Sequence, residues 1–486
     1  MDEGGFVLGA LAEWLAALGG IIPERVLAAI DLTIAIAVTW HALLTKREVG
    51  AATGWIGLAW ISPIVGGSLY FVFGINRVAR RGAQIRDQRR YTALIDVEPP
   101  AVDRDDHLAP LEKAVRLLTG RPSLAGNRVE LLQNGDAAYP RMLAAIAAAK
   151  RSVALSTYIL RDDAAGGPII DALIAAQARG CQVRVLIDGI GGGWFGSRTY
   201  ARLRRARVPV ARFMHSLWPW RMPFLNLRTH KKVLVVDGAR GFAGGMNIGA
   251  ENLVATSPRH PVRDSHFAFD GPAVAQLVDA FASDWEFVVG EMLEGDLWFP
   301  RLVEAGEAVA RVVTSGPDQD LEKFEFVTMH AIACARRSVQ VMTPYFLPDE
   351  RLVTALMLAA QRGVAVDVLV PERSNHRVVD LAMRANIAPL LRAGVRIWRN
   401  PPPFDHSKVM VVDGEWCLIG SANWDARSLR LNFELNVEVY HDDLAARLSA
   451  LIACNRAHPL TIAELDRRIL PTRLLDAGLR LLLPYL

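Results

Sequence analysis

A nine-residue pattern occurs twice in the chain, 176 residues apart, and this repetition constrains the possible folds more than any other feature. His230–Gly238 and His406–Gly414 both read H-x-K-x4-D-G. An asparagine follows each histidine by 17 residues, at Asn247 and Asn423. A repeat of this kind predicts two similar lobes, and 486 residues are enough to give each lobe a core. We expect one active site that takes one imidazole from each lobe.

Each pattern contains a run of four apolar, mostly β-branched residues, Val233–Val236 and Val409–Val412. Such runs predict strands that are buried on both faces. Side chains alternate along a strand, so the histidine and the lysine of each motif point the same way. These pairs are His230 with Lys232 and His406 with Lys408. Each motif therefore offers an imidazole beside an ammonium group.

Small residues precede both asparagines, after a second short strand in each half. Gly245 and Ser421 stand in turns where backbone N–H groups can approach an anion closely. Lysine, asparagine and backbone amides around a histidine make a phosphate site. With two copies, one histidine can attack phosphorus while the other protonates the leaving oxygen. The alternative, two structural strands with incidental basic residues, explains one H-x-K but not the matching offsets.

These residues resemble the phospholipase D superfamily, whose mark is a doubled HxKxxxxD motif. The resemblance implies phosphodiester transfer through a phosphohistidine, without a metal or other cofactor. It implies His230 and His406 as nucleophile and general acid, with His230 the nucleophile. It also implies that the motif lysines and both asparagines hold the phosphate. The motif aspartates, Asp237 and Asp413, complete the catalytic motif, and the resemblance implies that their role is mainly structural.

A downstream carboxylate orients each histidine in that superfamily. Glu434 lies 28 residues after His406 and fits this place in the second half. The equivalent position in the first half is Pro258, so we assign the role beside His230 to Asp264, which requires an insertion.

Helix-like and strand-like segments alternate in both halves, which predicts an α/β fold with mixed sheets flanked by helices. The expected lobes span residues 126–290 and 305–460, and the resemblance implies that they form a pseudo-twofold sandwich. The offset between matching segments falls from 187 at Tyr158 and Tyr345 to 176 at the histidines. This drift is typical of an old duplication with altered loops.

Residues 1–75 are expected to form a membrane region. Val26–Leu44 and Trp55–Phe73 each have 19 residues, enough to cross a hydrocarbon core of about 30 Å, and Phe6–Ile22 is expected to be interfacial. Buried core helices are the alternative. Residues 76–125 are expected to form a linker, and six arginines lie within it at 77–90. Basic residues beside a membrane span predict that the lobes lie in the cytoplasm. The alternative is a solvated basic linker that carries no information on topology. The amphipathic tail, 461–486, either lies in the membrane interface or packs on the core.

Asn423–Glu434, Trp60–Gly74 and Thr343–Asp349 resemble bacterial cardiolipin synthases, and the similarity extends over roughly residues 50–485. It implies transfer of a phosphatidyl group between two phosphatidylglycerols at the bacterial inner membrane. The expected partners are phosphatidylglycerol and anionic membrane lipid, because a net charge of +4 is too small to indicate nucleic acid. A membrane phospholipase D hydrolase is the main alternative, ahead of a nuclease or an inactive scaffold. Four dispersed cysteines predict neither a disulfide framework nor a zinc site.

Overall fold

The computed structural model describes residues 24–46, 49–74, 105–193, 196–215, 227–318 and 320–480. It forms two compact units that divide after Arg77, and each is described by itself. The described part of the N-terminal unit is helical. Its elements are α2 (Glu24–Thr45), α3 (Val49–Ile61), α4 (Pro63–Leu69) and the π-helical turn η1 (Tyr70–Gly74).

The helix α2 covers the first predicted span, and among the described helices it alone is long and apolar enough to cross a membrane. The second predicted span, Trp55–Phe73, is not one helix. It breaks at Ser62, whose φ of −146° and ψ of 84° are not helical, just before Pro63 opens α4. A proline ring disfavours the helical conformation in the residue before it, which accounts for this break. Phe6–Ile22 and the arginines at 77–90 lie outside the described residues.

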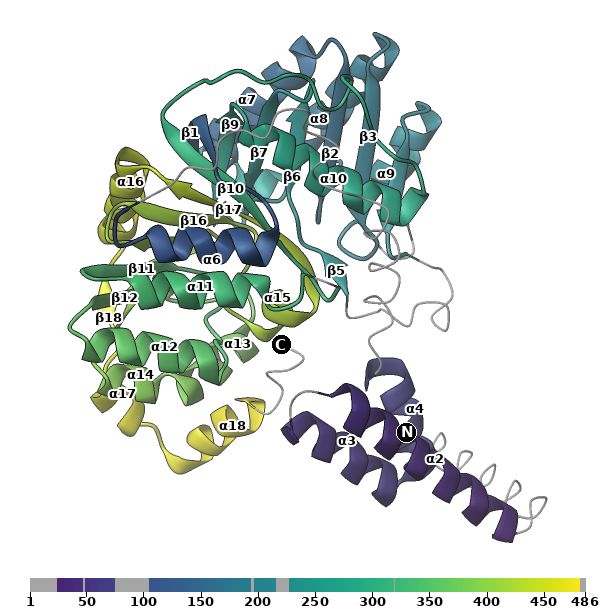
Figure 1. Cartoon of the computed structure of the whole chain (residues 1–486), viewed down its shortest axis with the longest axis vertical. Helices are drawn as coiled ribbons and strands as arrows, with labels where there is room; N and C mark the ends of the chain where they lie inside the picture. Colours follow the sequence, from purple (N-terminus) through teal and green to yellow (C-terminus); the bar gives the residue numbers. More distant parts are fainter. Residues whose placement is uncertain are drawn as a thin grey trace. The chain divides into compact units, whose positions relative to one another are not determined.

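The C-terminal unit, which begins after Arg77, is built on a 16-stranded sheet that runs through both lobes, in the order β18-β13-β12-β11-β15-β16-β17-β10-β1-β9-β7-β6-β2-β3-β4, with β5 paired to β17 (Figure 1). The first-lobe strands are β1 (Leu124–Gln133), β2 (Ser152–Thr157), β3 (Gln182–Asp188), β4 (Val210–Phe213), β5 (Arg228–Thr229), β6 (Val233–Val236), β7 (Arg240–Gly244), β8 (Val262–Arg263) and β9 (Ser265–Asp270). The second-lobe strands are β10 (Ala308–Ser315), β11 (Ser338–Met342), β12 (Ala365–Pro371), β13 (Arg396–Asn400), β14 (Phe404–Asp405), β15 (Val409–Val412), β16 (Trp416–Gly420), β17 (Asn432–Tyr440) and β18 (His458–Pro459).

The two lobes repeat one topology. In the first lobe β2, β3 and β4 are parallel, and β6, β7, β9 and β1 continue the sheet antiparallel. In the second lobe β11, β12 and β13 are parallel, and β15, β16, β17 and β10 follow antiparallel. The antiparallel pair β1–β10 joins the lobes. The predicted α/β fold of two similar lobes with mixed sheets is therefore confirmed.

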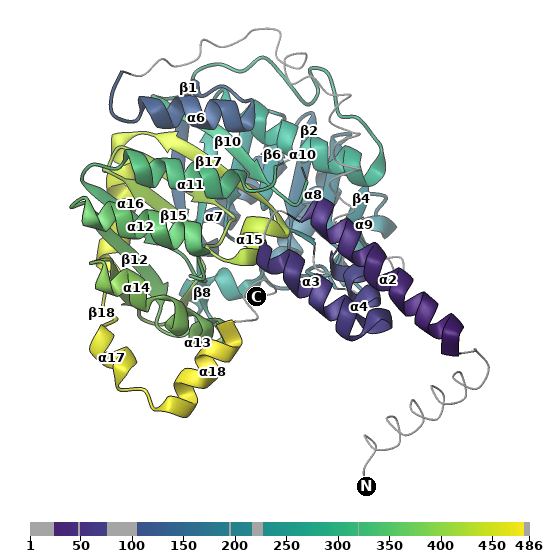
Figure 2. The same ribbon diagram turned by 60° about the horizontal axis from the view of Figure 1, so that its bottom comes forward.

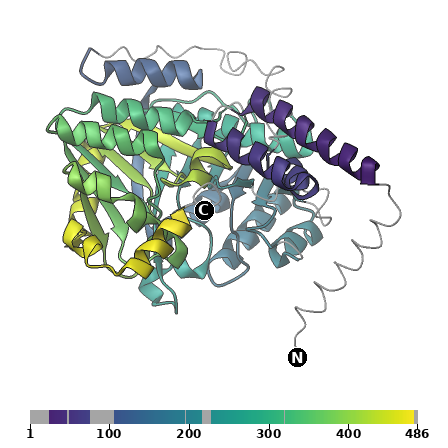
Figure 3. The same cartoon turned by 90° about the horizontal axis from the view of Figure 1, so that it is seen from below.

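Helices cover both faces of each lobe's sheet, and the lobes lie side by side in all three views (Figures 1, 2 and 3). The first-lobe helices are α7 (Asn134–Ala148), α8 (Gly166–Ala178), α9 (Arg198–Arg205), η4 (Ala250–Asn252), η5 (Val254–Thr256) and α10 (Ala273–Val289). The second-lobe helices are α11 (Lys323–Cys334), α12 (Glu350–Gln361), α13 (Arg377–Asn386), α14 (Ala388–Arg392), α15 (Ala426–Arg430) and α16 (Asp442–Cys454).

An inner hydrophobic core contains α10, α16 and the facing sides of both sheets, and each lobe has a further core on its outer side. The runs Val233–Val236 and Val409–Val412 contribute alternate residues to the inner and outer cores, and all eight side chains are buried. The prediction of strands buried on both faces is thus confirmed. The motif histidines lie three residues before these buried strands.

Two segments at the borders of the lobes differ from the sequence-based division. The expected linker 76–125 contains α6 (Ala109–Thr119), which packs on the second lobe. Its Glu112 side chain lies 3.3 Å from Arg311 Nη1 on β10. The tail contains α17 (Ile462–Asp466) and α18 (Leu470–Arg480), which lies beside α13 (Figure 2). One face of α18 therefore packs on the core, as the second of the two alternatives for the tail expects. The apolar side chains of Ile469, Leu470, Leu474 and Leu475 are exposed.

Candidate active site

Each motif histidine lies between a two-residue strand and the buried strand that follows it. The strand before His230, β5, pairs in parallel with β17 of the other lobe, and the His230 N–H donates to the Phe433 carbonyl at 2.8 Å. The strand before His406, β14, pairs with β8 of the first lobe, and the His406 N–H donates to the Arg263 carbonyl at 2.8 Å. The lobes therefore exchange short strands at the site.

This exchange brings the two imidazoles together. The ring centroids of His230 and His406 lie 6.3 Å apart, with the ring planes at 85°. Tyr158 packs edge-on against His230 at 5.4 Å, and Tyr345 packs against His406 at 6.2 Å. The two halves thus form one site, as the doubled motif predicts.

The carboxylate behind each histidine comes from the opposite lobe, so our assignment of one carboxylate to the histidine of its own half is wrong. Glu434 accepts from His230 Nδ1 at 2.9 Å, and Asp264 accepts from His406 Nδ1 at 2.8 Å. The exchanged strands explain this crossing. Each histidine pairs through its backbone with the residue immediately before the partner lobe's carboxylate, Phe433 or Arg263.

These pairs fix the tautomer of both rings. A carboxylate accepts hydrogen bonds, so Nδ1 of His230 and of His406 carries a proton and Nε2 is left for the reaction. Burial is the largest influence on the rings, and it lowers the pKa of His230 to about 4 and that of His406 to about 3. Burial raises the pKa of Asp264 and Glu434, but the facing imidazoles and lysines more than reverse this effect. At this site, therefore, two neutral imidazoles face two carboxylates.

The motif lysines are buried beside the histidines. The Lys232 ammonium donates to the His230 carbonyl at 2.6 Å, and the Lys408 ammonium donates to the His406 carbonyl at 2.5 Å. Burial lowers the pKa of Lys232 to about 7 and that of Lys408 to about 8. Both ammonium groups can neutralise the equatorial oxygens of a bound phosphate.

The paired asparagines line the same space. Oδ1 of Asn247 and of Asn423 is buried without a hydrogen-bond partner among the described residues. Buried amide groups are normally satisfied, so both side chains are suited to a polar ligand. Gly245 is required beside them because a Cβ there would lie 2.7 Å from an Asp264 carboxylate oxygen and 3.2 Å from the Lys408 side chain.

Ser421 supports the acid rather than the phosphate. Its hydroxyl donates to Glu434 Oε2 at 2.5 Å. Two further residues, which our sequence analysis did not assign to the site, hold the other oxygen: Ser428 donates to Oε1 at 2.8 Å and Asn432 at 3.2 Å. Both residues lie between Asn423 and Glu434 in the sequence, and this position could have indicated that they belong to the site.

The motif aspartates lie at the far ends of β6 and β15, away from the histidines. Asp237 accepts from the N–H groups of Arg151 at 2.7 Å and Ser152 at 2.9 Å. Asp413 accepts from the N–H groups of Arg337 and Ser338, both at 2.7 Å. These contacts agree with the supporting role and do not place either carboxylate among the reacting groups.

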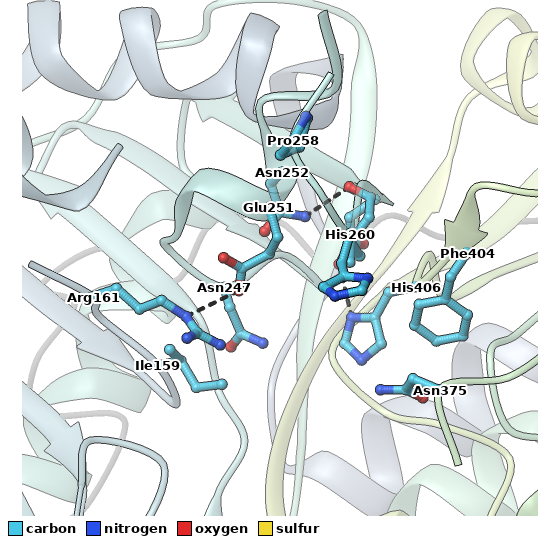
Figure 4. A pocket seen from close by; sticks show the side chains of 12 residues that line it. Ile159, Arg161, Asn247, Glu251, Asn252, Pro258, His260, Asn375, Phe404 and His406 are labelled. Atoms are coloured by element: carbon cyan, nitrogen blue, oxygen red, sulfur yellow. Dashed lines mark hydrogen bonds and ion pairs between the residues drawn. The ribbon is translucent and has the colours of Figure 1, made fainter. Parts of the chain in front are cut away.

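Two cavities that share part of their walls open at the histidines. The larger, of about 730 Å³, contains His230, Arg228 and Arg427 in its wall. The smaller, of about 420 Å³, lies beside His406, where Asn247 and Arg161 face Asn375 and Phe404 (Figure 4). His406 and Asn247 line both cavities. Within the part of the chain that the structure describes, no three His, Cys, Asp or Glu side chains are grouped to hold a metal.

The fold and the shared histidines define a two-lobed enzyme of the phospholipase D type. A family model described as "Cardiolipin synthase, PLD-like domain" matches residues 142–285 and 328–453. The chain belongs to this cardiolipin synthase family.

Similar proteins support the assignment along the whole chain. Cardiolipin synthase A of Pseudomonas aeruginosa (strain LESB58) is 36% identical over 452 residues, which cover 90% of this chain and 91% of the relative. The cardiolipin synthase of Geobacillus sp. (strain WCH70) is 32% identical, with 99% and 98% covered. The crystal structure of phosphatidylserine synthase from Haemophilus influenzae Rd KW20 has a TM-score of 0.58 at 16% identity. It covers 77% of this chain and 100% of that chain, and it shows similarity of fold.

Proposed function

We propose that this chain is a cardiolipin synthase that transfers a phosphatidyl group from one phosphatidylglycerol to another. The observation that carries this proposal is the pair of imidazoles, 6.3 Å apart between ring centroids, each backed by a carboxylate of the other lobe. Relatives named cardiolipin synthase, similar over most of the chain, supply the substrate class.

In the first half-reaction, Nε2 of His230 attacks the phosphorus of one phosphatidylglycerol. The bond from phosphorus to the glycerol oxygen breaks, and His406 gives its Nε2 proton to that oxygen. The bound phosphodiester anion raises the pKa of the facing imidazole, so His406 gains the proton when substrate binds. Lys232, Lys408, Asn247 and Asn423 hold the phosphate oxygens.

In the second half-reaction, the primary hydroxyl of another phosphatidylglycerol attacks the phosphohistidine. Its proton passes to Nε2 of His406, the P–N bond breaks, and the electron pair returns to His230. The products are cardiolipin and glycerol; His230 is again neutral, and His406 is again protonated and gives up that proton when the products leave. Attack by water on the same intermediate gives phosphatidic acid instead, which is the hydrolase outcome.

We also propose that the protein works at the bacterial inner membrane with its lobes in the cytoplasm. The helix α2 has 22 residues, about 33 Å at 1.5 Å per residue, enough for one crossing. The bent segment Val49–Gly74 supplies the second crossing, and the six arginines at 77–90 flank it on the cytoplasmic side.

Product analysis tests the enzymatic proposal. The purified full-length protein is incubated with labelled phosphatidylglycerol, and the lipids are identified by mass spectrometry. Equal amounts of cardiolipin and free glycerol are expected. Phosphatidic acid with free glycerol, and no cardiolipin, would establish the hydrolase instead. The His230→Ala and His406→Ala variants are the controls, and each is expected to form no product.

A further inference from the structure

The helix α18 presents leucines to solvent and buries a carboxylate. Leu470, Leu474 and Leu475 are 54% to 66% exposed, whereas Asp476 is 3% exposed. Leu470 and Leu474 lie about one turn apart on the helix, and Leu475 lies beside them. Asp476 lies on the other side, where Arg468 Nη2 donates to its carboxylate at 2.8 Å. A surface helix normally buries its apolar face, so the exposed face of α18 calls for an apolar partner.

This exposed face lies close to the active-site cavity. The helix α18 packs against α13 (Figure 2), and the axes of packed helices are about 8–10 Å apart. The first turn of α13 lines the 730 Å³ cavity through Arg377 and Val378. The same cavity contains His230 and His406 in its wall. A surface in contact with the leucines of α18 is therefore one helix away from the cavity in which the reaction occurs.

Basic side chains lie beside these two helices. A further cavity of about 690 Å³, bordered by α13 and α17, has four arginines and three carboxylates in its wall. Two of the carboxylates are engaged, because Glu464 pairs with Arg399 and Asp380 accepts from the Ser374 N–H at 3.1 Å. Arg467 and Arg473, next to the leucines in the chain, are exposed. The surface around α18 therefore combines an apolar face with cationic groups.

A bilayer of anionic lipid matches both features. Interfacial helices bury an apolar face about 5–10 Å into the boundary of headgroups and acyl chains, and basic residues at their edges attract anionic headgroups. The relatives of this chain are cardiolipin synthases, which implies a phospholipid substrate. The acyl chains of such a substrate lie in a bilayer, while its phosphodiester must reach the two imidazoles. The cavity therefore has to lie at a membrane surface.

A second copy of the chain matches the surface less well. In a symmetric dimer the same residues of both copies meet around a two-fold axis. A contact through α18 would therefore bring together two sets of the arginines beside it, and like charges across an interface oppose association.

We propose that α18 is an interfacial docking helix, which seats Ile469, Leu470, Leu474 and Leu475 in the surface of an anionic bilayer. Because α18 packs on α13, this contact holds the active-site cavity close to the membrane that contains the substrate. The inference rests on the proposed function only in taking a bilayer phospholipid as the substrate. The four side chains orient the C-terminal unit and do not touch the reacting atoms.

The first measurement locates α18 in the full-length protein, reconstituted into vesicles of phosphatidylcholine and phosphatidylglycerol. A polarity-sensitive fluorophore is attached at Leu474→Cys, in a Cys454→Ser background because Cys454 is exposed. The matched control is Leu117→Cys, which is 76% exposed on α6 of the same lobe. Lipids with a quencher on the acyl chain are expected to quench the label at 474 strongly and the label at 117 little. Vesicles of phosphatidylcholine alone, or Arg467→Gln with Arg473→Gln, should weaken this quenching.

The second measurement asks whether docking serves the reaction, by following glycerol release. Leu474→Glu with Leu475→Glu is compared with Leu117→Glu plus Leu358→Glu, two exposed leucines of α6 and α12. On phosphatidylglycerol vesicles, the docking variant is expected to lose kcat/KM by about tenfold or more, the effect of removing one or two leucines from an apolar contact. On short-chain phosphatidylglycerol dissolved as monomers, its kcat/KM should stay within about twofold of wild type, which also shows that it folds. The control variant should match wild type on both substrates.

A label at 474 that is quenched no more than the label at 117 would overturn the proposal. A label that is shielded from water but not quenched by the lipid would overturn it too, because protein would then cover α18. So would an equal loss of glycerol release on vesicles and on monomers, since the leucines would then serve the fold or the chemistry. Failure of the proposed function looks different: the label is quenched and glycerol is released, but wild-type protein forms phosphatidic acid and no cardiolipin.

Discussion

The crossing of the carboxylates makes each histidine depend on a side chain of the other lobe. Sequence spacing located Glu434 and, with an assumed insertion, Asp264, but it assigned each acid to the wrong ring. The pairing is set by β5 and β14, which have two residues each. Strands this short carry no periodic signal, so their partners cannot be predicted from one sequence.

Removal of either acid should damage catalysis and spare the fold. Glu434→Gln or Asp264→Asn takes away the charge that fixes the Nδ1–H tautomer and stabilises the imidazolium. We expect kcat for cardiolipin formation to fall about 10²-fold or more in each variant. Glu130→Gln is the control, because that acid on β1 pairs with Arg141 at 2.8 Å and lines neither cavity. Near-normal kcat in both acid variants would show that the carboxylates do not tune the histidines.

The buried lysines predict a pH dependence. Burial lowers the pKa of Lys232 to about 7 and that of Lys408 to about 8, so each lysine loses its positive charge as the pH rises through that value. Because kcat/KM reports the free enzyme, we expect it to fall with rising pH above about 7. The bound phosphate raises both pKa values, so kcat should fall less. A kcat/KM that is flat between about pH 6 and about pH 9 would contradict the shifted lysines.

Within each motif, the buried strand separates the histidine from the aspartate. The histidine lies before the buried strand and the aspartate after it, so the two act at opposite ends. Asp237 and Asp413 both have positive φ, 52° and 55°, and their carboxylates bind the N–H groups at the start of β2 and β11. The run of four apolar residues predicted these strands correctly. The same reasoning treated Trp55–Phe73 as one span, although the Pro63 within it was a signal for a bend.

Asp413→Asn should lower stability rather than catalysis. Asparagine tolerates positive φ but cannot accept all of the hydrogen bonds at this turn, which include one from His107 Nε2 at 2.8 Å. We expect a lower melting temperature in detergent, equivalent to about 1–3 kcal/mol, with kcat near wild type at low temperature. Asp237→Asn is the companion variant. Normal melting with lost activity would place these acids in the reaction.

For the molecule as a whole, the doubled motif predicted the two lobes, the shared site and most of the residues around it. It could not reveal that α6 folds with the second lobe, because the contact between Glu112 and Arg311 joins positions 199 residues apart. Nor could it reveal that one face of α18 packs against α13 while another is exposed to solvent. Both arrangements depend on tertiary contacts between distant segments, which no local pattern records.

Membrane topology gives a prediction for the complete chain. Alkaline phosphatase fused after residue 48 should be active, since the loop between the two proposed crossings faces the periplasm. Fusions at residues 92 and 486 should be inactive, because the proposed topology keeps the arginine-rich flank and the lobes in the cytoplasm. Activity at 486 would refute the cytoplasmic placement. Inactivity at 48 alone would reduce the crossings and leave the chemistry untouched.

The most direct measurement is capture of the covalent intermediate in wild-type protein. Phosphatidylglycerol labelled in its phosphatidyl group is mixed with enzyme and quenched in alkaline denaturant, since a P–N bond survives alkali better than acid, and the peptides are sequenced by mass spectrometry. We predict the label on His230, lost when unlabelled phosphatidylglycerol is added before the quench, with labelled cardiolipin appearing in its place. Cardiolipin formation with no labelled histidine in either motif, under conditions where the intermediate is stable, would contradict the shared two-lobe site.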